Sequence, residues 1–150
     1  MNPVSAIIAR YIGDNIPSLT VGTNLFAGWE PAEPANVVTI FDVPGMPSLV
    51  TFSGPVKISN PAIQIRIRNI EYAAGWAMAW DIRNLLHGQM NLTIYDDDES
   101  GSTESSFDST ESAETICFAL IKCVQEPHIL DWDEKQWVRI VSTYYCIKNN

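Results

Sequence analysis

The sequence predicts an α+β fold in which two α-helices pack against a mainly antiparallel β-sheet. Two observations predict it: the segments follow the order helix, strands, helix, strands, and residues 63–68 alternate strictly between apolar and polar side chains. The 150 residues suit one domain, 1–150, which carries a flexible acidic, Ser-rich insertion at about 96–114.

The first segment is predicted to be a helix near the start of the chain. Asn2 can cap it, Pro3 suits its first position, and Gly13 can end it. Apolar residues follow with helical spacing: Val4, Ile7, Ile8, Tyr11 and Ile12. A loop rich in turn-forming residues should then run from 14 to 34.

The next segments are predicted strands. Residues 37–41 are β-branched and aromatic, and a turn over 42–45 should end them. Residues 49–52 have weak strand character. Alternation over 63–68 places three isoleucines on one face and Gln64, Arg66 and Arg68 on the other.

A second helix follows directly. Asn69 can cap it, Glu71 falls in its first turn, and His87 and Gly88 can end it. Its aromatic residues are spaced four apart, which favours a core-facing stripe over a ligand-stacking role: Tyr72, Trp76 and Trp80.

The rest of the chain is predicted to be β-structure interrupted by the acidic insertion. Residues 92–95 form a short strand. Two longer apolar segments, 115–124 and 136–145, should pair as a hairpin with a long tip over 126–135.

Charge excludes several classes of function. The chain has 18 acidic and 9 basic residues, and eight of the acidic ones lie in the insertion, so the remainder is nearly neutral. Clustered Lys and Arg for nucleic acid or an anionic membrane are missing from this composition, so we expect neither sequence-specific nucleic-acid binding nor a membrane partner. The start lacks a signal-peptide pattern, and three cysteines favour a reducing cytosol over a disulfide framework.

Catalytic, cofactor and metal sites are not predicted. Cys117 and Cys123, six residues apart, should share one strand face as structural cysteines, and the histidines His87 and His128 show no catalytic spacing. A hard cation could bind an acidic hairpin tip, but a solvated turn is favoured for its residues: His128, Asp131, Asp133 and Glu134.

Two segments carry a family resemblance. Residues 28–45 combine a Pro-rich entry with a strand that ends in Asp42 and a Gly turn. Residues 60–88 combine Pro61, the alternating strand, and a helix with Tyr72 near its start. With the closing hairpin around 130–134, they resemble the tail terminator (tail completion, often labelled minor capsid) proteins of long-tailed bacteriophages. The acidic insertion departs from that pattern.

The resemblance implies a structural protein with no cofactor. Its expected form is a homohexameric ring that caps the tail tube, stops tail elongation and joins the tail to the head connector. Its partners would be other copies of itself, the tail tube protein and the head connector or completion protein, in a virion neck assembled in the host cytoplasm. The alternatives are a head-completion or connector-adaptor ring, and a small cytosolic ligand-binding module using Trp29, Trp76 and Trp80.

Two sets of residues are candidate surfaces of such a ring. The row Gln64, Arg66 and Arg68 could set the register between subunits, against the alternative of a solvated sheet face. The insertion could line a channel and repel DNA, although a solubilising outer loop is favoured. Its acidic residues are Asp96, Asp97, Asp98, Glu99, Glu104, Asp108, Glu111 and Glu114.

Overall fold

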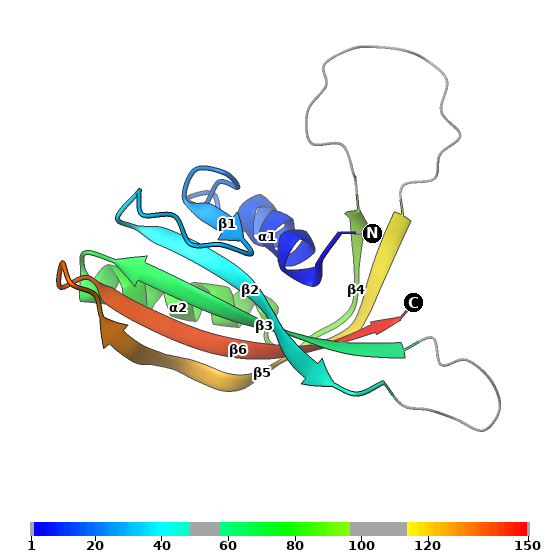
Figure 1. Cartoon of the computed structure of the whole chain (residues 1–150). Helices are drawn as coiled ribbons and strands as arrows, with labels where there is room; N and C mark the ends of the chain where they lie inside the picture. Colours follow the sequence, from blue (N-terminus) through cyan, green and yellow to red (C-terminus); the bar gives the residue numbers. More distant parts are fainter. Residues whose placement is uncertain (1, 49–57, 97–113, 150) are drawn as a thin grey trace, which may run out of the picture.

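The computed structural model describes residues 2–48, 58–96 and 114–149, and it confirms an α+β fold (Figure 1). Six strands form one curled sheet in the order β1-β2-β3-β6-β5-β4, antiparallel except for the β1–β2 pair. The elements are α1 Val4–Asn15, β1 Leu25–Ala27, β2 Val37–Met46, β3 Ile58–Asn69, α2 Tyr72–Leu86, β4 Gln89–Asp96, β5 Glu114–Trp132 and β6 Val138–Asn149.

Both helices cover the same face of the sheet. α1 packs on β1 and β2, and α2 packs on β3, β5 and β6. The three isoleucines of β3 (Ile63, Ile65 and Ile67) lie in the core cluster between the layers, as their alternation predicted. Burying these apolar faces is the main force that holds the helices on the sheet. None of the described helices is long and apolar enough to cross a membrane.

The helix ends differ from the sequence prediction. Pro3 rather than Asn2 is the N-cap residue of α1, and its carbonyl accepts the Ala6 and Ile7 N–H groups. α1 also continues through Gly13 to Asn15, and Pro17, which cannot extend a helix, follows the Ile16 cap. In α2 the N-cap residue is Glu71, and the Asn69 side chain accepts its N–H.

The expected loop over residues 14–34 contains the short strand β1, and the turn expected over 42–45 does not end β2. The short β1 pairs parallel with β2, and its three residues give too weak a periodic signal to be found in sequence. β2 continues past Asp42 to Met46. Gly45 permits this because a Cβ there would lie 1.9 Å from the Asn60 carbonyl oxygen. The expected strand 49–52 lies outside the described residues.

The final hairpin is longer than predicted. β5 extends to Trp132 and β6 begins at Val138, so the expected tip over 126–135 is mostly strand. Register shifts recur along β5, and the one between Phe118 and Leu120 reverses the alternation of faces. Cys123 therefore joins the core while Cys117 does not, so the expectation that both share one face is wrong.

Candidate assembly surfaces

The polar row of β3 lies on the sheet face opposite the helices, as predicted. The two arginines are not solvated there. The segment 30–35 folds back over this face, and Glu30 meets both arginines, at 3.2 Å from Arg66 and 3.1 Å from Arg68. Gln64, half-buried, makes no side-chain hydrogen bond or ion pair with a described residue.

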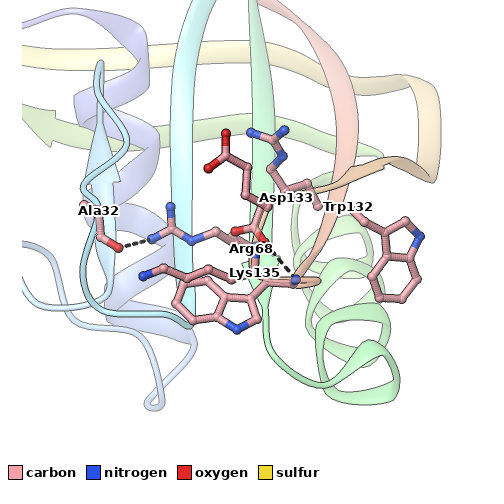
Figure 2. A pocket seen from close by; sticks show the side chains of 8 residues that line it. Ala32, Arg68, Trp132, Asp133 and Lys135 are labelled. Atoms are coloured by element: carbon pink, nitrogen blue, oxygen red, sulfur yellow. Dashed lines mark hydrogen bonds between the residues drawn. The ribbon is translucent and has the colours of Figure 1, made fainter.

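Arg68 acts as a clamp on this segment. Its Nη2 donates to the carbonyl oxygens of Pro31, Ala32 and Pro34 at 2.8–3.0 Å, and its Nε donates to that of Ala35 at 3.3 Å. Only 8% of the residue is exposed. Figure 2 shows Arg68 reaching across to Ala32. A guanidinium can satisfy several acceptors at once because its five N–H donors are fixed in one plane.

Arg66 contacts the segment 30–35 through Glu30 alone, and so makes fewer hydrogen bonds to it than Arg68 does. Its guanidinium pairs with Glu30 and lies 5.1 Å from the centre of the Phe41 ring. Its Nε and the hydroxyl oxygen of Thr39, the residue paired with it across β2 and β3, are buried without a hydrogen-bond partner among the described residues. Glu30 was not predicted to be a functional residue. The one sign of it in the sequence is a carboxylate within a Pro-rich loop.

The hairpin tip faces the clamped segment across an open pocket of about 410 Å³ (Figure 2). Lys135 lies 4.6 Å from the centre of the Trp137 ring and 3.7 Å from a carboxylate oxygen of Glu33. Arg68 also lies over the Trp137 ring, at 5.7 Å. Arg68 makes five hydrogen bonds, and all of them go to residues of the segment 30–35, so its charge is used within the chain rather than for a ligand in this pocket.

Three of the four residues suggested for cation binding at this tip have other partners, and the fourth, Glu134, is exposed. Asp131 pairs with Arg139 at 2.6 Å, and Asp133 accepts the backbone N–H groups of Lys135 and Trp137. The ring of His128 lies 2.9 Å from the Glu126 carbonyl oxygen. Within the residues that the structure describes, no group of three or more His, Cys, Asp or Glu side chains is placed to hold a metal ion.

A second polar cluster lies where α2 meets β5. Arg83 of α2 pairs with Glu126 at 2.9 Å, which raises the pKa of the guanidinium and lowers that of the carboxyl. Nearby, the Cys123 backbone N–H donates to His87 Nδ1. This nitrogen is therefore engaged as an acceptor rather than placed against the thiol, and burial raises the pKa of the Cys123 thiol. A nucleophilic cysteine needs the opposite shift.

These thiol environments predict unequal reactivity. We expect iodoacetamide at pH 8 to modify half-buried Cys117 at least tenfold faster than Cys123 or Cys146, because burial raises the pKa of both core thiols, that of Cys146 to about 12. Mass spectrometry of tryptic peptides measures the three rates. In denaturant the rates should become equal, and fastest labelling of Cys146 in the native protein would contradict the described packing.

The predicted core stripe of α2 is confirmed only at Trp76, which packs against the core. The helix contacts the sheet through its small and aliphatic residues Gly75, Ala79, Ile82 and Leu86, while Tyr72 is 44% exposed and Trp76 and Trp80 are half-buried. Gly75 permits this because its face lies against β3 and β6, where a Cβ would come within 3.0 Å of Asn69 and 3.5 Å of Ile140. Large rings cannot occupy that contact and lie beside it.

The aromatic residues suggested as a ligand pocket do not form one group. Trp29 packs edge-to-face on Phe26, with ring centres 5.4 Å apart, whereas Trp76 and Trp80 contact each other on α2. Positions 97–113 of the acidic insertion lie outside the described residues. The backbones of Asp96 and Glu114 pair as the last rung between β4 and β5.

Comparison with known proteins identifies the family. Comparison with curated protein sequences finds no match. A family model described as "Bacteriophage tail terminator protein" matches residues 7–150, which include α1 from its fourth residue, all of α2 and every strand. The chain therefore belongs to the bacteriophage tail terminator proteins.

Proposed function

We propose that the protein forms a homohexameric ring that caps the phage tail tube, stops the addition of tube subunits and joins the finished tail to the head connector. The observation that carries this proposal is the family match over residues 7–150. In this role the protein is a structural component of the virion neck, assembled in the host cytoplasm, without catalysis or a cofactor.

The two edges of the sheet would supply the two different surfaces that a ring contact needs. A closed ring joins one surface of each subunit to a different surface of the next. On one side, β1 covers β2 only from Val38 to Ile40; on the other, β4 covers β5 only as far as Ile121. Both strands continue beyond their partners, to Met46 and to Trp132, and most residues of these extensions are exposed, although the Cys123 N–H of β5 already donates to His87.

Side chains rather than strand pairing should make the contact along β5. Pro127 has no N–H to donate, and the repeated register shifts bend the strand, both of which oppose addition of another strand. The polar row of β3 is a second candidate contact. There Gln64 would face the neighbour directly, and Arg66 and Arg68 would act by holding the Glu30 segment in place.

The acidic insertion is proposed to face solvent, with a channel lining as the alternative. Replacing residues 97–113 by a neutral Gly/Ser linker of equal length distinguishes them. Unchanged DNA ejection from the resulting virions supports the solvent-facing loop. Slower ejection, caused by loss of repulsion between carboxylates and DNA phosphates, would support the channel.

Adding the purified protein to purified tail tubes that were assembled without it tests the ring directly. Electron microscopy should then show a six-fold ring at one end of each tube, and such tubes should no longer elongate when tube subunits are added. Binding to head connectors but not to tubes would contradict the terminator role and favour the head-completion alternative. A monomer in solution would be compatible with assembly on the tube end.

A further inference from the structure

Four aromatic rings form a continuous ladder on the surface between α2 and β5. The aromatic ladder, as we call it, runs from Trp132 through Tyr72 and Trp76 to Trp80, with successive ring centres 6.5, 6.0 and 6.3 Å apart. These distances lie in the range of favourable aromatic pairs. Figure 2 shows Trp132 turned away from Arg68 and Lys135, toward its own side of the hairpin.

The aromatic ladder is accessible to a partner. Tyr72 and Trp132 are 44% and 49% exposed, and the apolar neighbours Ile70 and Leu130 are exposed as well. Trp and Tyr are the residues most often found at the energetic centre of protein interfaces. Contiguous exposed apolar surface of this kind marks an interaction site more often than isolated exposed residues do.

Charge around the aromatic ladder indicates the chemistry of its partner. Glu71 directly precedes Tyr72 and Asp81 directly follows Trp80, and both carboxylates are exposed without an ion pair to any described residue. Arg83 already lies 5.6 Å from the centre of the Trp80 ring, so one end of the aromatic ladder holds a guanidinium. Exposed carboxylates adjacent in the chain to residues of the aromatic ladder favour a cationic partner.

A second copy of this chain offers little of that charge from its described residues. Four arginines are paired with carboxylates of their own chain, and Arg10 and Lys148 also have partners within it. Lys135 lies on Trp137, which leaves Lys122 as the one basic side chain with no described contact in residues 2–48, 58–96 and 114–149. One such lysine cannot pair with both carboxylates, which favours a different protein as the partner of this face.

We propose that the aromatic ladder binds a protein segment that presents arginine or lysine side chains, which stack on the rings and pair with Glu71 and Asp81. The proposal depends on this face alone, so its failure would leave the terminator role intact. In the proposed ring this would be a contact with a different protein, which is recognised through cation–π contacts and surface ion pairs.

Calorimetric titration of the full chain with a defined peptide tests the proposal. The probe is an eight-residue peptide that alternates Arg and Leu, compared with the same peptide carrying Glu in place of Arg. We expect saturable one-to-one binding of the Arg peptide alone. The double variant Tyr72→Ala/Trp132→Ala should weaken it about tenfold, and Glu71→Gln/Asp81→Asn about fivefold, with a smaller loss at high salt.

Matched variants separate this site from general attraction to an acidic protein. Trp29→Ala removes another exposed aromatic ring, and Asp14→Asn removes another exposed carboxylate, so both should bind like wild type. Circular dichroism confirms that each variant is folded. Undiminished binding by the Tyr72→Ala/Trp132→Ala variant, or equal binding of the Glu peptide, would overturn the proposal. So would self-association of the chain that this double variant abolishes, because the occupant would then be a second copy.

Discussion

Arg68→Ala is expected to lower the free energy of unfolding by about 3–5 kcal/mol, the range measured when one partner of a buried ion pair is removed. The substitution would remove one of the two arginines that pair with the Glu30 carboxylate, which is 13% exposed, and leave Arg66 as its one remaining partner among the described residues. It would also leave the backbone carbonyls of Pro31, Ala32 and Pro34 without a donor. Urea unfolding followed by circular dichroism measures the change.

Two further variants show whether geometry or charge matters at this position. Arg68→Lys keeps the charge but cannot present several N–H groups in one plane, so we expect an intermediate loss. Arg83→Ala removes a half-buried arginine from its pair with the exposed Glu126 and should change stability far less. A loss below about 1 kcal/mol for Arg68→Ala would contradict the clamp, since even an ordinary hydrogen bond contributes that much.

Tyr144→Ala is expected to lower the free energy of unfolding by about 3–5 kcal/mol, as is typical when a buried aromatic residue is truncated. Tyr144 is fully buried in β6 and is among the largest buried side chains. Burial raises the pKa of its phenol, so the ring stays neutral in the core. Thermal or urea unfolding measures the loss.

Tyr144→Phe is the matched control because it keeps the ring and removes only the hydroxyl. That oxygen accepts a 3.3 Å hydrogen bond from the Ser142 hydroxyl, and its loss should cost about 1 kcal/mol. Equal costs for the Ala and Phe variants would show that the hydroxyl rather than the packing of the ring stabilises this part of the core.

Periodicity predicted the central sheet and both helices because it reports which face of an element is buried. The alternation of residues 63–68 fixed the orientation of β3 correctly, down to the buried isoleucines. The same reasoning failed on α2. Its aromatic spacing is helical, but Gly75 and Ala79 are buried against the sheet and Trp76 packs only partly buried beside them, because the close approach of helix and strands leaves no space for an indole.

Long-range partners could not be predicted from one sequence. The alternation correctly placed Arg66 and Arg68 together, yet Glu30, more than 30 residues away, decides what they do. The bulge after Phe118 likewise separated Cys117 from Cys123, and no local composition signalled it. The site at the aromatic ladder depends on Trp132, which reaches Tyr72 only because β5 continues past its expected end.

The terminator role is tested most directly by electron microscopy of particles made after the gene for this protein is disabled in its phage genome. The proposed function predicts tail tubes of uncontrolled length, lying apart from DNA-filled heads, and restoration of normal tails when the protein is supplied from a plasmid. Tails of normal length beside heads that have lost their DNA would contradict that role and place the protein on the head side.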